Sequence, residues 1–143
     1  PRRQAELDWT GEDGAENSIG SLLYHIAVVE ISWLYFDCLN RPAPEHVQAV
    51  LPHELVVGDR LTHVSGEALG LHLARLHLTR RQFLDEVRRM SLADWELLRH
   101  PPGENYEVTP GWAVFHLVEH EAAHTGQILA LKPRAIRATA GGA

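Results

Sequence analysis

The stretch His116-Leu-Val-Glu-His120-Glu-Ala-Ala-His124-Thr-Gly-Gln127 predicts a helix with one inward-looking side, and this helix sets the fold. Side chains three and four residues apart lie on one face of a helix. At about 100° per residue, the three histidines fall within roughly 80° of one another. The same stripe is otherwise apolar and holds Ala113, Leu117, Ile128 and Leu131. One histidine on such a face would be an ordinary core residue, but a pair at i and i+4 favours a metal site.

His120-Glu-Ala-Ala-His124 also matches the H-E-x-x-H pattern of zinc proteases, in which the histidines bind zinc and the glutamate is the general base. The metzincin form of that pattern needs a glycine and a third histidine downstream, where this chain has Gln127 and Ala130. No Asp, Glu or His follows Thr125, so a downstream carboxylate ligand is excluded as well. The pattern argues against a metalloprotease and requires a third ligand from an upstream helix.

An upstream helix can supply that ligand. Asn17-Ser18 is an N-cap signal, and the apolar run behind it continues to about Leu39, where Asn40 and Pro42-Ala43-Pro44 end it. One face of this helix carries residues at spacings of three and four, namely Leu22, His25, Val29, Ser32, Trp33 and Phe36. A polar group in the middle of an apolar face is costly unless it has a partner. His25 is therefore the candidate third ligand.

The remaining segments complete an all-α protein. The pattern predicts an irregular crossover with a short helical turn at 41–64, helices at 65–90 and from Ser91 to before Pro101, and a last helix from Thr109-Pro110 to Lys132-Pro133. We expect residues 1–143 to form a single domain, an antiparallel four-helix bundle with an irregular crossover connection. The ends, 1–16 and 135–143, are expected to be poorly ordered.

Composition narrows the class of protein. The chain has 143 residues and a formal net charge of −6, which fits one acidic domain of ordinary size. Arg80-Arg81 and Arg88-Arg89 are interpreted as the solvent-exposed side of a helix, so neither nucleic acid nor a membrane is expected as a partner. The single cysteine, Cys38, allows no internal disulfide. No signal peptide or 18-residue uninterrupted apolar stretch occurs, which predicts a soluble cytoplasmic protein.

Two blocks of the sequence resemble a known family. The first is Asn17-Ser-Ile-Gly-Ser-Leu-Leu-Tyr-His25-Ile-Ala27 with Glu30 and Trp33, and the second runs from Thr109-Pro-Gly-Trp112 through His116, His120-Glu121 and His124 to Gly126-Gln127. This arrangement is similar to the DinB/YfiT-like superfamily of metalloenzymes over roughly Asn17 to Leu131. The resemblance implies a four-helix bundle, often dimeric, with a divalent metal held by His25, His120 and His124. Ala123 and Thr125 depart from the family pattern beside the last ligand.

The resemblance also implies a reaction. Characterised relatives include thiol-dependent S-transferases and a maleylpyruvate isomerase that use thiols such as mycothiol or bacillithiol. Three neutral imidazoles suit zinc or nickel, as well as iron or copper, and leave a coordination position open. The leading interpretation is a homodimeric thiol S-transferase acting on a small-molecule thiol and an electrophile. The alternatives are a hydrolase that uses metal-bound water and a non-catalytic metal-binding protein of the stress response.

Four further residues are candidates for the surroundings of the metal. Glu121 lies about 100° from His120 on the helix and could act as a general base or point elsewhere. Glu30 could accept the free N–H of a ligand imidazole or could pair with an arginine. His116 and Gln127 share the metal stripe and either bind substrate or water or only pack. Trp33 and Trp112 are expected in the core close to the site, and the alternative is that they form a wall for the substrate.

Overall fold

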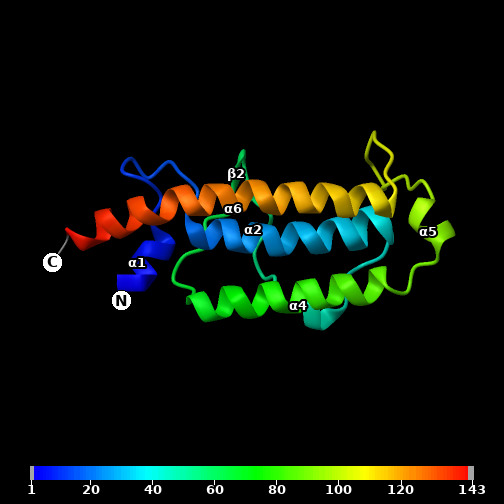
Figure 1. Cartoon of the computed structure of the whole chain (residues 1–143), viewed down its shortest axis with the longest axis horizontal. Coiled ribbons are helices and arrows are strands. Elements are labelled where there is room, and N and C mark those ends of the chain that lie inside the picture. The colour runs from blue at the N-terminus through cyan, green and yellow to red at the C-terminus, as the bar shows by residue number, and fades with distance from the viewer. Residues whose placement is uncertain (1, 142–143) are drawn as a thin grey trace.

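Three long helices form the framework of the molecule. The structure, a computed structural model, describes residues 2–141. In it, α2 (Ile19–Ser32) continues into the π-helical turn η1 (Trp33–Cys38), and α4 (Leu69–Val87) and α6 (Pro110–Ala140) pack on either side of α2 (Figure 1). The shorter elements are α1 (Arg2–Asp8), α3 (Glu45–Gln48), α5 (Leu92–Glu96) and the hairpin of β1 (Val56–Val57) with β2 (Arg60–Leu61). The predicted all-α fold is confirmed.

The predicted antiparallel arrangement holds for one pair of long helices. α6 runs antiparallel to α2, whereas α4 runs in the same direction as α2 (Figure 1). The contacts agree, because the guanidinium of Arg75 lies over the ring of Tyr24 and, further along both helices, Gln82 donates to the hydroxyl of Tyr35. The crossover after η1 returns the chain along the bundle, so α4 begins beside the start of α2. The fourth helix expected from the sequence is only the short α5.

Local signals place the start of α2 as predicted. Ser18 is the N-cap, and its hydroxyl oxygen accepts a hydrogen bond from the backbone N–H of Ser21. α2 is the central helix, with Leu22 and Tyr24 each 1% exposed. Ile19–Cys38 is long and apolar enough to cross a membrane by composition, but 67% of that stretch is buried inside the protein. Such burial is typical of a helix at the core of a bundle.

α6 begins as predicted and ends later than predicted. The Thr109 hydroxyl accepts from the Trp112 backbone N–H, and Pro110 occupies the first turn. The helix does not stop at Lys132-Pro133 but continues to Ala140. A proline inside a helix removes one hydrogen bond and crowds one carbonyl. Burial of Leu131 and Ala135 on either side of Pro133, together with the alanine-rich continuation, outweighs that cost.

The N-terminal segment is also more regular than expected. Arg2–Asp8 forms α1, and Leu7 is buried in a cluster with Ile19, Leu22 and Leu131. A single leucine in a polar stretch gives no periodic signal, so this helix could not be predicted from the sequence. It is stabilised by packing against α2 and α6. Residues 1, 142 and 143, which belong to the ends expected to be poorly ordered, lie outside the described residues.

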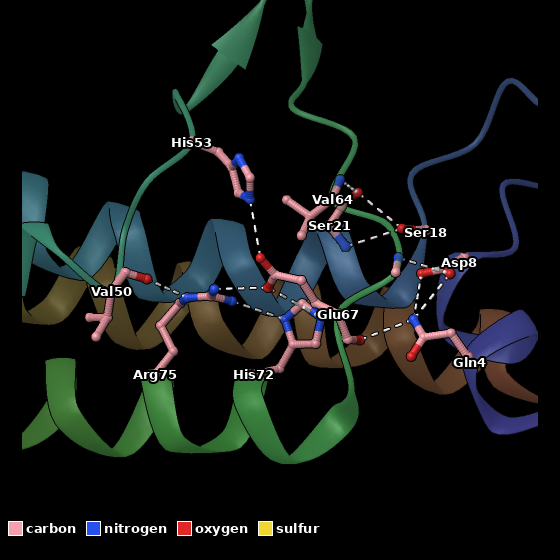
Figure 2. A network of polar contacts seen from close by, with 11 residues as sticks. Gln4, Asp8, Ser18, Ser21, Val50, His53, Val64, Glu67, His72 and Arg75 are labelled. Atoms are coloured by element: carbon pink, nitrogen blue, oxygen red, sulfur yellow. Dashed lines mark hydrogen bonds and ion pairs between the residues drawn. The ribbon is translucent and has the colours of Figure 1, made fainter. Parts of the chain in front are cut away.

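A polar network holds the crossover against the bundle (Figure 2). Arg75, which is 3% exposed, donates from Nε to the carbonyl of Val50 at 2.6 Å and from Nη2 to Glu67 at 2.8 Å. Glu67 also meets Nε2 of His53 at 3.1 Å, and Ser21 Oγ accepts from the backbone N–H of Val64 at 3.0 Å. The predicted short helical turn within this crossover is α3. The network fixes one side of α2 and leaves the side toward α6 for the histidines.

Candidate metal centre

α2 and α6 bring the three predicted ligands together. His25 comes from the middle of α2, and His120 and His124 come from successive turns of α6. Each can offer one ring nitrogen to a common point, and these three nitrogens lie within 4.8 Å of one another. Nε2 of His120 is 3.0 Å from Nε2 of His25 and 3.0 Å from Nε2 of His124. The helical spacing and the antiparallel packing of the two helices therefore produce one three-histidine cluster.

The cluster is electrostatically suited to a cation. Burial, together with the neighbouring imidazoles of His120 and His124, lowers the pKa of His25 to about 4. Burial likewise lowers the pKa of His120 to about 4, with contributions from His124 and His116. Both rings are therefore neutral near pH 7. A neutral imidazole has a free lone pair, which is the form that binds a metal.

The geometry fits a small divalent ion. Zinc–nitrogen bonds of about 2.0–2.1 Å in a tetrahedral site place the nitrogens about 3.4 Å apart, close to the 3.0 Å contacts within this cluster. Nδ1 of His25 and Nδ1 of His120 are buried and have no hydrogen-bond partner among the described residues. Three imidazoles packed this closely, without any carboxylate in the cluster, have a donor set that suits a divalent transition-metal ion.

Gln127 orients one of the three rings. Its Oε1 lies 2.8 Å from Nδ1 of His124. A carboxamide oxygen only accepts, so Nδ1 of His124 carries the proton and Nε2 presents its lone pair to the cluster. Metal-bound histidines usually donate their second N–H in this way. Gln127 is thus in polar contact with a candidate ligand, and its binding of substrate or water stays a prediction.

Glu30 and Glu121 are brought together by an arginine. Arg80 of α4 donates from Nε to Glu30 and from Nη2 to Glu121 at 2.5 Å. Glu30 is 4% exposed, and its burial raises the pKa of its carboxyl while Arg80 opposes that rise. Glu30 thus pairs with an arginine, the second of its two predicted alternatives. Arg80 is solvent-exposed, as interpreted from the sequence, and it also bridges the two carboxylates, which the sequence did not indicate.

His116 stands beside the cluster as part of an aromatic wall. Its ring stacks on Trp112 with centroids 5.0 Å apart and an interplanar angle of 7°, and it lies 4.8 Å from Trp33. The ring of His116 is 6.3 Å from that of His120. Trp112 is 51% exposed, so it is a surface residue and not the core residue expected from the sequence. The three rings form an aromatic group one helical turn of α6 from His120, with Trp33 tilted by 49° from Trp112 and by 55° from His116.

Fold and site together define a class of protein, a helical domain in which two packed helices place three histidines around one point. A family model described as the DinB superfamily matches residues 3–128. The chain belongs to the DinB superfamily, and the resemblance based on the two sequence blocks is confirmed. No curated protein and no solved structure matches the chain.

Proposed function

We propose that this protein is a divalent-metal-dependent enzyme of the thiol S-transferase type, with His25, His120 and His124 as the metal ligands. The convergence of three ring nitrogens within 4.8 Å carries the proposal. Zinc or nickel is the proposed ion, because neutral imidazoles suit both. Three protein ligands leave a coordination position open, which is typical of catalytic and not of structural sites.

A divalent ion bound there would favour the deprotonated form of a small thiol and orient its sulfur. The reaction then forms a bond between sulfur and an electrophilic carbon, and the leaving group departs with the electron pair of the bond that breaks. The residues of the chain position the metal ligands and the electrophile. Gln127 fixes the ring of His124, and the wall of Trp33, Trp112 and His116 provides a surface on which a planar electrophile can stack beside the cluster.

A metal-dependent hydrolase is the second candidate. The observation that favours it is Glu121, a carboxylate on the turn of α6 that carries His120 and near enough to affect the His120 ring electrostatically. A general base in this position would serve hydrolysis. Activity that depends on added thiol separates the transferase from the hydrolase, and the lack of any turnover would leave a metal-binding protein of the stress response.

We further propose that the protein is a cytoplasmic homodimer. Phe115, Val118 and Leu129 of α6 are 61%, 63% and 66% exposed, and their spacing places them along one side of the helix. Exposed apolar side chains in a row support an interface between two copies. Light scattering on the Val118→Glu variant tests this, since a charge at the interface should shift a dimeric mass to that of a monomer.

Elemental mass spectrometry on untagged protein tests the metal centre. We expect about one zinc or nickel per chain in the parent protein and little in His25→Ala or His120→Ala. His100→Ala is a matched control, because the His100 side chain is 69% exposed and lies on another segment. A parent protein that binds neither ion after incubation would overturn the proposal, and so would full metal content in both ligand variants.

A further inference from the structure

A cavity of about 480 Å³ lies where α1 meets α2, α4 and α6. In Figure 1, α1 lies at the end of the bundle where α2 and α4 begin. All four helices contribute apolar side chains to this cavity, which are Leu7, Ile19, Leu23, Leu69 and Ile128. The three histidines of the metal centre are not among the residues that line it, so it is a separate site. Its volume is in the range of pockets that hold small organic ligands.

The floor of the cavity belongs to the hydrophobic core. Leu7 and Ile19 are each 8% exposed and belong to one core cluster, against which Leu23 and Ile128 pack. Their neighbours already hold these side chains in place, so the apolar floor exists before any ligand binds. Leu69, the first residue of α4, also lines the cavity but is 42% exposed. An alkyl chain bound here would therefore remove apolar surface from water on both partners.

The charged residues that line the cavity have an excess of positive charge. Arg3 of α1 and Lys132 of α6 line it, and neither side chain makes an ion pair or a hydrogen bond with another of the described residues. Glu6 is the one carboxylate of the lining. Asp8, the other carboxylate of α1, does not line the cavity and accepts from the backbone N–H of Gly66 at 3.1 Å. The lining is thus net positive in a chain whose formal net charge is −6, which favours an anionic ligand.

We infer that this cavity binds a medium-chain carboxylate, with the alkyl chain against the apolar floor and the carboxylate against Arg3 and Lys132. α1 packs on α6, and the two cationic side chains are long and flexible, so they can converge on one carboxylate. A neutral hydrocarbon would leave both cations without a partner. A sugar or a nucleotide would bury polar groups against a floor that has no polar side chain to bond them. The inference does not depend on the proposed function, because the ligand lies outside the metal centre.

Isothermal titration calorimetry with decanoate tests the site on the untagged full chain, below the concentration at which decanoate forms micelles. We expect one decanoate per chain and a negative change in heat capacity, because apolar surface is buried. Butyrate has the same carboxylate but little apolar surface, and decyltrimethylammonium has the same alkyl chain but a positive head group. Both should bind at least about tenfold more weakly, because each lacks one of the two interactions.

Variants of the lining separate the two interactions. Arg3→Met and Lys132→Met remove a charge and keep an extended side chain, so each should weaken decanoate about five- to tenfold, as for loss of a charge-assisted hydrogen bond. Leu69→Ala should weaken it about three- to tenfold, because the apolar lining becomes smaller. The matched controls are Arg88→Met, at a side chain 70% exposed, and Leu92→Ala, at a position of α5 that is 72% exposed. Neither control should change the affinity.

A carboxylate could also bind a metal ion, so chelator-treated protein and His25→Ala are titrated as well. Unchanged affinity in both supports the cavity as the site, whereas loss of binding in both would assign the carboxylate to the metal centre and overturn the inference. Amide NMR signals of the parent protein locate the ligand independently of any variant. Decanoate should shift signals at 3–7, 19–23 and 128–132. The inference is overturned if none of these signals shifts, or if decanoate and decyltrimethylammonium bind equally.

Discussion

At the scale of single residues, Gln127 links the metal cluster to its surroundings. Its carbonyl oxygen fixes the His124 ring by a 2.8 Å contact to Nδ1. We expect Gln127→Ala to retain the fold and to weaken zinc binding about 10–100-fold, as is typical when a partner of a ligand imidazole is lost. Competition against a chromophoric chelator measures the affinity. Gln48→Ala, which removes a glutamine bonded to the Ala43 carbonyl far from the cluster, is the control. Unchanged affinity in Gln127→Ala would mean that the contact does not orient the ligand.

One conservative substitution tests whether Glu121 acts as a general base. The Glu121→Gln variant keeps the size of the side chain but removes the proton acceptor, so we expect metal content to stay the same and turnover to fall at least about tenfold. Turnover is measured with a thiol and 1-chloro-2,4-dinitrobenzene. Glu119→Gln, at an exposed position of α6, is the matched control. Turnover equal to that of the parent would mean that Glu121 takes no part in the reaction and serves only as the ion-pair partner of Arg80.

Residue identities at the cluster were predictable, and residue partners were not. His25 could be selected because one histidine interrupts an apolar face, and His120 and His124 because i,i+4 pairs share a face. The role of Arg80 was missed, because an Arg-Arg pair on an amphipathic helix looks the same whether it meets solvent or two carboxylates. Which of two alternatives Glu30 adopts depends on α4, and a one-helix pattern contains no information about a neighbouring helix.

At the scale of elements, Pro133 is the residue whose low helix propensity disagrees most clearly with the observed structure. It lies inside α6, where it leaves the carbonyl of Leu129 without its usual helical donor. We expect Pro133→Ala to raise the free energy of unfolding by about 1–3 kcal/mol. Denaturant unfolding measures this, with Lys132→Ala as a neighbouring control at an exposed position that keeps the proline. A loss of stability would contradict this expectation and would mean that Pro133 itself is needed for the packing of α6 against α1.

Helix starts were predicted better than helix ends and short elements. The side chains of Ser18 and Thr109 accept hydrogen bonds from backbone N–H groups three residues away. Because this N-cap signal is local, it can be recognised in the sequence. α1 and the last two turns of α6 exist because Leu7, Leu131 and Ala135 are buried against one another's helices. Such packing is a long-range effect, which explains why the expected disorder of 1–16 and the expected end at Lys132-Pro133 differ from the structure.

At the scale of the whole molecule, the cluster joins two helices that are far apart in sequence. His25 and His120 are 95 residues apart and meet at 3.0 Å. A metal that bridges them is a cross-link between α2 and α6 that exists only in the folded state. Ligands that bind only the folded state stabilise it by mass action. The same cluster without metal places three imidazoles in one partly buried site, which makes the fold sensitive to acid.

This sensitivity has a definite sign. In the metal-free protein, burial holds the pKa values of His25 and His120 at about 4, against an ordinary value of 6.5, and burial also lowers the pKa of His72. Between pH 6.5 and 4 these histidines therefore bind more protons in the unfolded chain than in the folded chain, so their contribution to stability falls as the pH falls. The raised carboxyl pKa values of Glu30 and Asp37 act in the opposite direction.

A comparison of variants isolates the contribution of the cluster. We expect the melting temperature of chelator-treated protein to fall from pH 6.5 to pH 4, and to fall less steeply in His25→Phe, which removes one titrating ring and fills its volume. His72, Glu30 and Asp37 are common to both proteins, so they cancel in the difference between the two slopes. His100→Ala should keep the slope of the parent, because its ring is largely exposed. Equal slopes in the parent and in His25→Phe would mean that the three rings do not lie together in the metal-free protein in solution, and the site would then form only when an ion assembles it.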